Sequence, residues 1–428
     1  MRLLYWTLEM NNKRKRKLSP HTSAKAVYFY NTLGSLTNAL FYMVLLMVIN
    51  HIGSEYEGGV FAIGYAIASL TWVIGSFETD PYQATDAAEL FAFGHYLAQK
   101  TLLCVVMMVV SICIVRVRGG SIYEQGIILS LCLYKALDAF SGVFYARLQK
   151  YGRLDLSGKS LCCRIGISTV LLVIIRLISG RLLLAILAAC VAEIIWIAVY
   201  EMRLVGSVYE MKPLFDWVKI GKMIRECFPL FISVFLLTFL TNLPKFTMDV
   251  YYPTEMQAAF SSLFMPASVI NLLSLFVFRP SLTLLSENWV KGDVKAFRNR
   301  IAYFLKVILG LTILAMAFAW IIGTQVLSLI YGLELRSYKA ALVMIMFGGG
   351  FSAVATLMNN MLVIMRKQKY VLLGNVISLC LSLVLCVPMV RSGGMTGAAG
   401  LYATGMVFMG GPMMIVVLHL MKKRQYAN

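Results

Sequence analysis

Charged side chains inside long apolar runs are the residues of this sequence best suited to chemistry. Lys135 and Asp138 stand three residues apart in LCLYKALDAFSGVFYARLQK, and Lys245 and Asp249 stand four apart in TNLPKFTMDVYY. Both spacings place the two side chains on one face of a helix. Each pair can neutralise itself, or the lysine can face a cavity beside a carboxylate that tunes it or takes a proton. The residues alone leave both interpretations open.

Glu193 stands in AACVAEIIWIAVY without a basic residue close by in the sequence. A lone carboxylate within an apolar run is either satisfied by another helix or titrates, and we favour the structural role. Together with Asp138 and Asp249, it forms the candidate set for coupling transport to H⁺ or Na⁺. No other cofactor is expected.

The stretch around Pro244 combines several groups that a simple apolar helix does not need. Pro244 removes a backbone donor, so we expect a helix break there, beside Asn242 and Lys245. Broken helices with polar groups at membrane depth usually line a pathway. Two arginines, Arg147 and Arg279, are expected near inner span ends, where the simplest interpretation is a snorkelling anchor. The candidate substrate-binding residues are Lys135, Lys245, Arg279, Asn242 and Arg147.

Motifs for enzymatic chemistry are missing from the sequence. It contains no GxxxxGK[ST], no DxD pair, no GxSxG and no HExxH, and its four histidines match no metal-ligand spacing. We therefore predict that the protein is not an enzyme and holds no metal.

Composition indicates an integral membrane protein with many spans. The chain has 428 residues, of which 60% are hydrophobic and 14% charged, whereas a soluble domain has about a quarter charged residues. It carries 39 Lys plus Arg against 20 Asp plus Glu. We interpret this excess as basic cytoplasmic loops rather than nucleic-acid binding. The nine cysteines are expected to be free thiols, because no predicted outer loop holds a pair.

About 12 segments are long and apolar enough to cross a bilayer. Placing the N-terminus in the cytoplasm puts about 30 basic residues inside and about 8 outside, which favours cytoplasmic N- and C-termini. The basic start is interpreted as a tail before a retained first span, and either Met1 or Met10 can be the first residue. The expected spans are roughly 26–49, 60–79, 97–116, 124–146, 160–179, 182–202, 227–250, 257–278, 302–323, 339–364, 370–390 and 397–420.

The spans divide into two halves of six. Windows starting at Thr37-Asn38 and at Thr241-Asn242 each hold two spans and end in a charged residue followed by proline. Equal halves of the same topology are typical of parallel-repeat transporters. The expected organisation is a tail (1–25), an N-terminal bundle (26–202), a cytoplasmic linker (203–226), a C-terminal bundle (227–420) and a second tail (421–428).

Four short motifs occur in an order that resembles a known family. They are HIGSEYEGGVFAIGYAIASL, SGVFYARLQKYGRLDLSGKS, TNLPKF and GGMTGAAG. The set resembles the Wzx-type flippases of lipid-linked oligosaccharides, within the multidrug/oligosaccharidyl-lipid/polysaccharide exporter superfamily, over roughly residues 25–420. The resemblance implies an all-α membrane protein with two six-helix bundles in a V around a central cavity. It also implies alternating access.

The resemblance implies a substrate, a location and partners as well. The substrate would be a polyprenyl-pyrophosphate-linked repeat unit for O-antigen-like surface polysaccharide or lipopolysaccharide, moved across the bacterial cytoplasmic membrane. The partners would be membrane lipid and the polymerase and other proteins of polysaccharide export, and no nucleic acid. Lys135 and Lys245, one from each half, are the best-placed donors to the pyrophosphate, because cations in a hydrated cavity offset its desolvation.

The sequence leaves three alternative functions open. A cation-coupled drug antiporter of the same superfamily would use the carboxylates of Asp138, Glu193 and Asp249. A membrane polysaccharide polymerase or glycosyltransferase belongs to a different class, and it would typically need a large outer loop or a nucleotide-sugar site. A non-transporting scaffold of an export complex is the third.

Overall fold

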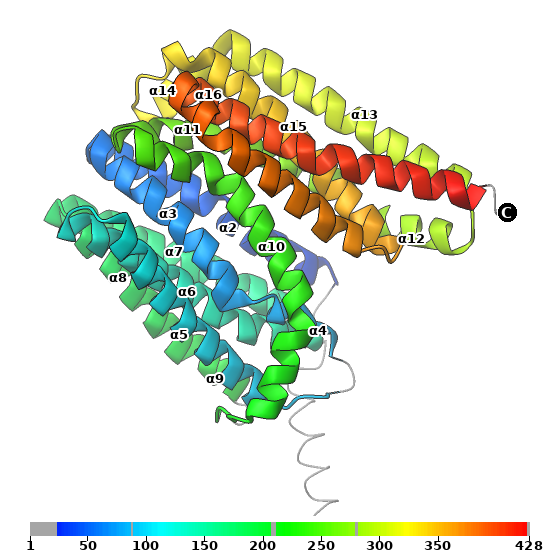
Figure 1. Cartoon of the computed structure of the whole chain (residues 1–428). Helices are drawn as coiled ribbons and strands as arrows, with labels where there is room; N and C mark the ends of the chain where they lie inside the picture. Colours follow the sequence, from blue (N-terminus) through cyan, green and yellow to red (C-terminus); the bar gives the residue numbers. More distant parts are fainter. Residues whose placement is uncertain (1–23, 87–88, 207–210, 279–280, 426–428) are drawn as a thin grey trace, which may run out of the picture. The chain divides into compact units, whose positions relative to one another are not determined.

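The computed structural model describes residues 24–86, 89–206, 211–278 and 281–425, and all regular structure in these ranges is helical. The elements are α2 (Ala24–Ile52), α3 (Glu55–Ser76), α4 (Thr79–Thr85), α5 (Phe93–Arg118), α6 (Ile122–Lys150), α7 (Leu154–Ser179), α8 (Leu182–Trp196), η1 (Ile197–Glu201), α9 (Met202–Gly206), α10 (Trp217–Tyr251), α11 (Glu255–Phe278), α12 (Leu282–Val290), α13 (Val294–Phe318), η3 (Ala319–Gly323), α14 (Thr324–Tyr331), η4 (Arg336–Tyr338), α15 (Lys339–Ile364) and α16 (Lys369–Gln425) (Figure 1).

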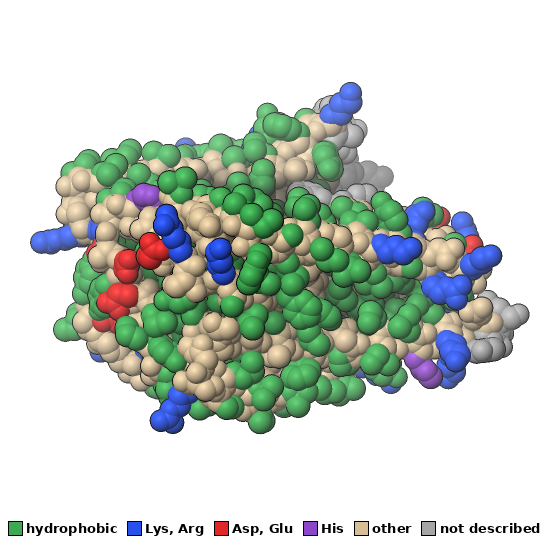
Figure 2. Space-filling view, turned by 90° about the horizontal axis from the view of Figure 1, so that it is seen from above, with side chains coloured by type: hydrophobic (Ala, Val, Ile, Leu, Met, Phe, Trp, Pro, Cys, Tyr) green, Lys and Arg blue, Asp and Glu red, His purple; other side chains and the backbone are tan. Residues whose placement is uncertain are grey.

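Eleven helical stretches of the described chain are long and apolar enough to cross a membrane. The last, α16, has 57 residues, and its backbone leaves helical geometry at Gly394 (φ 53°, ψ −129°). It is therefore two helices joined by a kink, which confirms the prediction of about 12 spans in an all-α membrane protein. Figure 2 shows the same property at the surface, where hydrophobic side chains are spread over the visible face and most charged side chains lie toward the two ends of the view.

The chain forms two compact units. Unit 1 comprises Met1–Gly53 and Gly64–Phe231, and in it α7 packs against both α2 and α8 while α6 packs against α4, α5 and α8. Gly34 of α2 and Gly158 of α7 bring two backbones together: a Cβ on Gly158 would lie 2.2 Å from the carbonyl oxygen of Tyr30. Small residues allow this close approach, which gives helices in a membrane much of their packing.

Unit 2 comprises Ser54–Ile63 and Ile232–Asn428, with α15 packed against α11, α13 and α16. Three consecutive glycines of α15 explain its central position. A Cβ on Gly348 would meet the ring of Tyr402, one on Gly349 would meet Ala267, and one on Gly350 would meet Thr312. Each glycine therefore admits a different neighbouring helix, α16, α11 or α13, at close approach.

The helix α10 begins in unit 1 and ends in unit 2. It is continuous from Trp217 to Tyr251, so the helix break expected at Pro244 is wrong. Pro244 is buried and still lacks an N–H, which leaves the carbonyl of Leu240 without its usual helical donor. One missing hydrogen bond does not interrupt this long apolar helix. Transmembrane helices commonly tolerate proline in this way.

Candidate functional site

The guanidinium of Arg164 lies at the centre of a buried ionic cluster in unit 1. Arg164 comes from α7 and its side chain is 1% exposed. Its Nη2 donates to Oδ1 of Asp138 on α6 at 2.5 Å, and its Nη1 donates to Oε2 of Glu193 on α8. Its Nε lies 3.8 Å from Oε1 of Glu201. One cation therefore joins three carboxylates from three parts of the chain.

A π-helical turn places Glu201 on the same side as Glu193. In an α-helix, with about 100° per residue, positions eight apart differ by about 80° in direction. Here the helix after Trp196 continues as the π-helical segment η1 (Ile197–Glu201), which ends at Glu201. A π turn takes up one extra residue, so the eight steps rotate about as far as seven α-helical steps, roughly 20° short of two turns. Both carboxylates consequently face Arg164.

Neutral groups extend the cluster around Glu201. The hydroxyl of Tyr145 accepts from Arg164 Nε at 3.1 Å and donates to Glu201 Oε1 at 2.6 Å. The hydroxyl of Ser160 donates to the same oxygen at 2.8 Å and accepts from the indole Nε1 of Trp196 at 3.0 Å. Glu201 therefore interacts with Arg164 mainly through Tyr145.

Lys135 and Asp138 form the ion pair that their spacing predicts. The Nζ of Lys135 is 3.7 Å from Oδ2 of Asp138, and it also lies 5.1 Å from the centre of the Tyr65 ring on α3. The pair is not isolated, because the other carboxylate oxygen of Asp138 binds Arg164. Asp138 thus bridges two cations, and a substrate-binding role for Lys135 stays a prediction.

Two members of the cluster do not stand out in the sequence. Arg164 follows the basic loop after the fourth span, and Glu201 falls next to the end of the sixth, so neither is among the predicted site residues. As expected, Glu193 has a partner on another helix, and this partner is Arg164 of α7. One feature of the sequence does point to Arg164. It lies on a polar stripe of α7 whose members recur every three or four residues: Ser157, Ser160, Arg164 and Ser168.

A second ion pair, with a buried lysine and a half-buried aspartate, lies where α3 meets α4. Lys100 of α5, 2% exposed, is 2.7 Å from Oδ1 of Asp80 and donates to the carbonyl oxygen of Ser76 at 3.1 Å. Phe77 and Glu78, between these helices, have positive φ angles of 48° and 54°. Two consecutive residues in this region store strain, and the lysine holds the turn by binding both sides of it.

Arg147 does not extend outward as the anchor interpretation expects. Its side chain is 4% exposed, and its guanidinium lies 5.7 Å from the Phe93 ring centre and 5.4 Å from that of Tyr151. Packing between aromatic rings stabilises a guanidinium by cation–π attraction. This arginine is part of the interior of unit 1.

In unit 2, Lys245 is buried among groups of α11. Its side chain is 6% exposed, and Nζ lies 5.2 Å from the centre of the Phe264 ring. Gln257 Nε2 donates to the Lys245 carbonyl at 2.8 Å. Gln257, Ser261 and Phe264 recur at helical spacing, so they share one face of α11. Among the described residues, neither Gln257 Oε1 nor Ser261 Oγ has a hydrogen-bond partner.

The remaining candidates are distributed as follows. Asn242 donates from Nδ2 to the carbonyl of Thr238 at 2.9 Å, on its own helix. Asp249 lies one turn beyond Lys245 on α10, half-buried. Arg279 lies outside the described residues. The structure thus joins Lys135, Asp138 and Glu193 through Arg164, and it places Lys245, Asn242 and Asp249 on one helix of the other unit.

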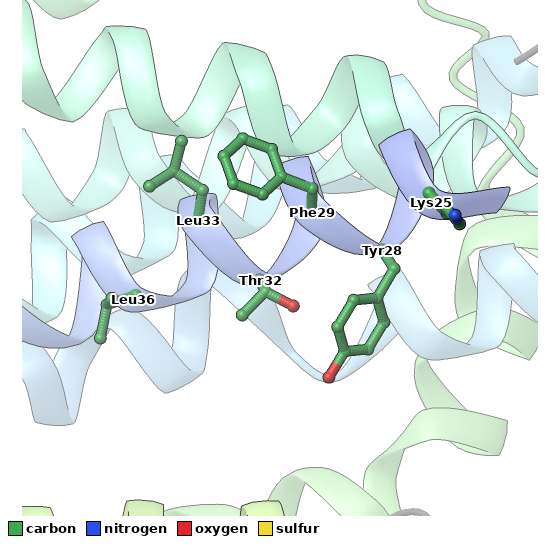
Figure 3. A pocket seen from close by; sticks show the side chains of 6 residues that line it. All are labelled: Lys25, Tyr28, Phe29, Thr32, Leu33 and Leu36. Atoms are coloured by element: carbon green, nitrogen blue, oxygen red, sulfur yellow. The ribbon is translucent and has the colours of Figure 1, made fainter. Parts of the chain in front are cut away.

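A separate hollow of about 750 Å³ runs beside the first half of α2 (Figure 3). Its lining is mostly apolar and includes Tyr28, Phe29 and Leu33, with Lys25 at one end. None of the candidate site residues lines it. Among the described residues, no three His, Cys, Asp or Glu side chains are grouped as metal ligands.

Comparison with known proteins shows what this fold is similar to. No protein-family model and no curated protein sequence matches the chain. Among solved structures, lipid II flippase MurJ in an inward closed conformation aligns with a TM-score of 0.68 at 15% identity, over 92% of this chain and 87% of that one. An inward-facing multidrug resistance MATE family transporter of the MOP superfamily aligns at 0.64 and 13%, over 95% and 99%.

A third solved structure is the Vibrio cholerae MATE transporter VcmN in its bent form. It aligns with a TM-score of 0.59 at 13% identity, over 98% of this chain and 99% of that one. At such identities, the likeness shows the fold. The chain shares the fold of these solved structures along nearly its whole length.

Proposed function

We propose that the protein is a flippase that moves a polyprenyl-pyrophosphate-linked oligosaccharide repeat unit across the cytoplasmic membrane by alternating access. The observation that carries the proposal is Lys245, a lysine buried within a membrane-spanning helix, with the Phe264 ring of α11 beside its ammonium nitrogen and Gln257 of α11 bound to its carbonyl oxygen. The shared fold with a lipid II flippase, over most of both chains, supports a lipid-linked substrate.

The chemistry of the substrate explains why such a lysine is useful. A pyrophosphate carries negative charge, and moving it into a low-dielectric slab without compensation is prohibitively costly. An ammonium group at membrane depth offsets part of that cost. Folding has already removed this group from water, so substrate binding does not add its desolvation. The polyprenyl tail can stay in the bilayer, so only the headgroup needs a polar route.

In this proposal, each unit contributes one lysine that binds the pyrophosphate: Lys135 in unit 1 and Lys245 in unit 2. Lys135 pairs with Asp138 and lies beside the Tyr65 ring, and Lys245 lies beside the Phe264 ring. The same assignment places the protein in a bacterial cytoplasmic membrane, beside polymerase and other proteins of surface polysaccharide export. Its product would supply O-antigen-like polymer.

A cation-coupled drug antiporter is a second candidate, favoured by two observations. The fold is shared with a multidrug resistance MATE transporter, and the Arg164 cluster holds more carboxylates than cations. Such an antiporter would export organic cations and would leave lipid-linked sugars where they are.

A reconstitution assay separates the two candidates. Purified protein is placed in lipid vesicles that contain a polyprenyl-pyrophosphate oligosaccharide with a fluorescent sugar label. A membrane-impermeant reductant bleaches the outer leaflet, and further bleaching reports translocation from the inner leaflet. The proposal expects translocation above that of protein-free vesicles. Transport of a cationic dye without translocation of the labelled lipid would instead establish the antiporter.

A further inference from the structure

The Arg164 cluster carries one negative charge in excess when its five charged members are ionised. Arg164 and Lys135 are the cations, and Asp138, Glu193 and Glu201 are the anions. Glu193 is fully buried and Glu201 is 2% exposed. A net charge at this depth is costly, because burial removes it from bulk water and the described cluster holds one cation too few to match it.

Two carboxylate oxygens of the cluster have no partner in the part of the chain that is described. They are Oε1 of Glu193 and Oε2 of Glu201. The other oxygen of each residue is engaged: Glu193 Oε2 binds Arg164, and Glu201 Oε1 accepts from Tyr145 and Ser160. An ionised carboxylate with a bare buried oxygen is poorly stabilised, whereas a protonated one has lost the charge that demands stabilisation.

Among the described residues, the other titratable groups around the cluster supply no missing charge. They are, by element, Tyr134 and Tyr145 on α6, Cys190 on α8, Tyr200 on η1, Tyr65 on α3, and the Asp80–Lys100 pair between α4 and α5. The tyrosines and the cysteine are neutral at ordinary pH, and Asp80 and Lys100 neutralise each other.

A metal ion does not suit this site as well as a proton does. The guanidinium of Arg164 occupies the centre on which the three carboxylates converge, so a second cation there would meet like charge. A proton can instead bind at either outer oxygen, away from the guanidinium. It comes from water and returns to water, and no other bond changes.

We propose that Glu193 and Glu201 together hold one exchangeable proton, which makes the Arg164 cluster a buried proton-binding site. The two carboxylates share Arg164 as a neighbour, so the proton is assigned to the pair and not to either residue alone. This inference rests on the cluster itself and is independent of the substrate that the protein carries.

Infrared spectroscopy of the purified protein tests the proposal directly. A protonated carboxyl has a C=O band that is separate from those of carboxylates and amides and shifts in D₂O. Spectra of wild type minus Glu201→Gln, and of wild type minus Glu193→Gln, are recorded between about pH 5 and about pH 9. We expect a positive band of about one carboxylic acid in both differences, because removing either negative charge balances the cluster and releases the proton.

The control is Glu255→Gln, which alters an exposed glutamate in the first turn of α11. Its difference spectrum should lack the band. If one of the two cluster variants fails to fold, as judged by gel filtration, the other still decides the matter. The proposal is overturned if neither cluster difference shows the band at any pH in the range, or if only an Asp80→Asn difference shows it.

Discussion

The hydroxyl of Tyr145 joins Arg164 to Glu201: it accepts from Arg164 Nε at 3.1 Å and donates to Glu201 Oε1 at 2.6 Å. The direct distance between that nitrogen and that oxygen is 3.8 Å, too long for a hydrogen bond. Tyr145 thus connects the guanidinium of Arg164 on α7 to the carboxylate of Glu201, at the end of the sixth span, through two hydrogen bonds.

Removing this hydroxyl should weaken unit 1. Tyr145→Phe leaves Arg164 Nε without its acceptor, and unmade hydrogen bonds to charged groups cost about 1.5–3 kcal/mol. Thermal unfolding of the purified protein should therefore show a lower midpoint. The matched control is Tyr303→Phe, which removes a hydroxyl from an exposed side chain on α13. Equal midpoints for Tyr145→Phe and wild type would contradict this account.

Arg164 should not be replaceable by lysine. A lysine presents one point charge, whereas the guanidinium directs three nitrogens at separate partners. A buried acceptor left without its donor costs about 1–3 kcal/mol, and more when it is charged, so Arg164→Lys should fold poorly. Combining it with Glu193→Gln should recover part of the loss, and a double-mutant cycle measures the coupling. Strictly additive effects of the two changes would show that the pair is not coupled.

Local spacing predicted the Lys135–Asp138 pair, because three residues along a helix fix which side chains meet. The rest of the cluster depends on which helices pack together. Arg164 reaches Asp138 and Glu193 across 26 and 29 residues of sequence, and no local pattern specifies that contact. Glu201 also required the π turn, which shifts the register of the helix after Trp196. Without the π turn, an α-helical projection of the sequence turns the Glu201 side chain about 80° away from that of Glu193.

The contact between α2 and α7 should tolerate no added methyl group. A Cβ on Gly158 would lie 2.2 Å from the Tyr30 carbonyl oxygen, and backbone cannot move aside as a side chain can. Gly158→Ala should therefore destabilise unit 1 by about 1–3 kcal/mol. Gly166→Ala is the control on the same helix, since a methyl group added there would have no neighbouring atom within 4 Å. It should be neutral or slightly stabilising, because alanine favours helix.

Hydropathy predicted nearly all of the spans, since a bilayer requires long apolar helices. It could not show that α10 runs unbroken through Pro244, because the cost of one missing hydrogen bond is decided by the helices around it. The grouping of Ser54–Ile63 with unit 2 was also beyond the sequence. That assignment follows from contacts such as Gly59 against Thr254, where a Cβ would lie 1.9 Å from a carbonyl oxygen.

The loop between α4 and α5 should make stability depend on acid pH. Burial by itself would raise the pKa of the Asp86 carboxyl, but hydrogen bonds from Leu90 N–H, the Tyr96 hydroxyl and Phe91 N–H lower it below its usual range. A lowered folded-state pKa contributes stability above the unfolded value of about 3.9, and this stability is lost as pH falls through the folded value.

Asp86→Asn should therefore lower the unfolding midpoint at neutral pH, and the difference from wild type should shrink as the solution is acidified below about pH 4. Denaturation followed at several pH values measures it. Asp293→Asn is the control: Asp293 caps α13 through the Ala296 N–H, and asparagine caps equally well. If the difference in unfolding midpoint between wild type and Asp86→Asn instead grew on acidification, this explanation would be rejected.

Lys245 offers the sharpest separation of function from stability. Lys245→Met keeps most of the side-chain volume and removes the ammonium group from a buried position, together with the cost of its desolvation. The folded protein should persist, while translocation of the labelled pyrophosphate lipid should slow by at least about tenfold, the equivalent of about 1.4 kcal/mol. Lys291→Met, at a lysine whose side chain is 71% exposed, should leave translocation unchanged. Wild-type translocation by Lys245→Met would remove this lysine from the substrate path, whereas equal slowing in both variants would point to general surface charge.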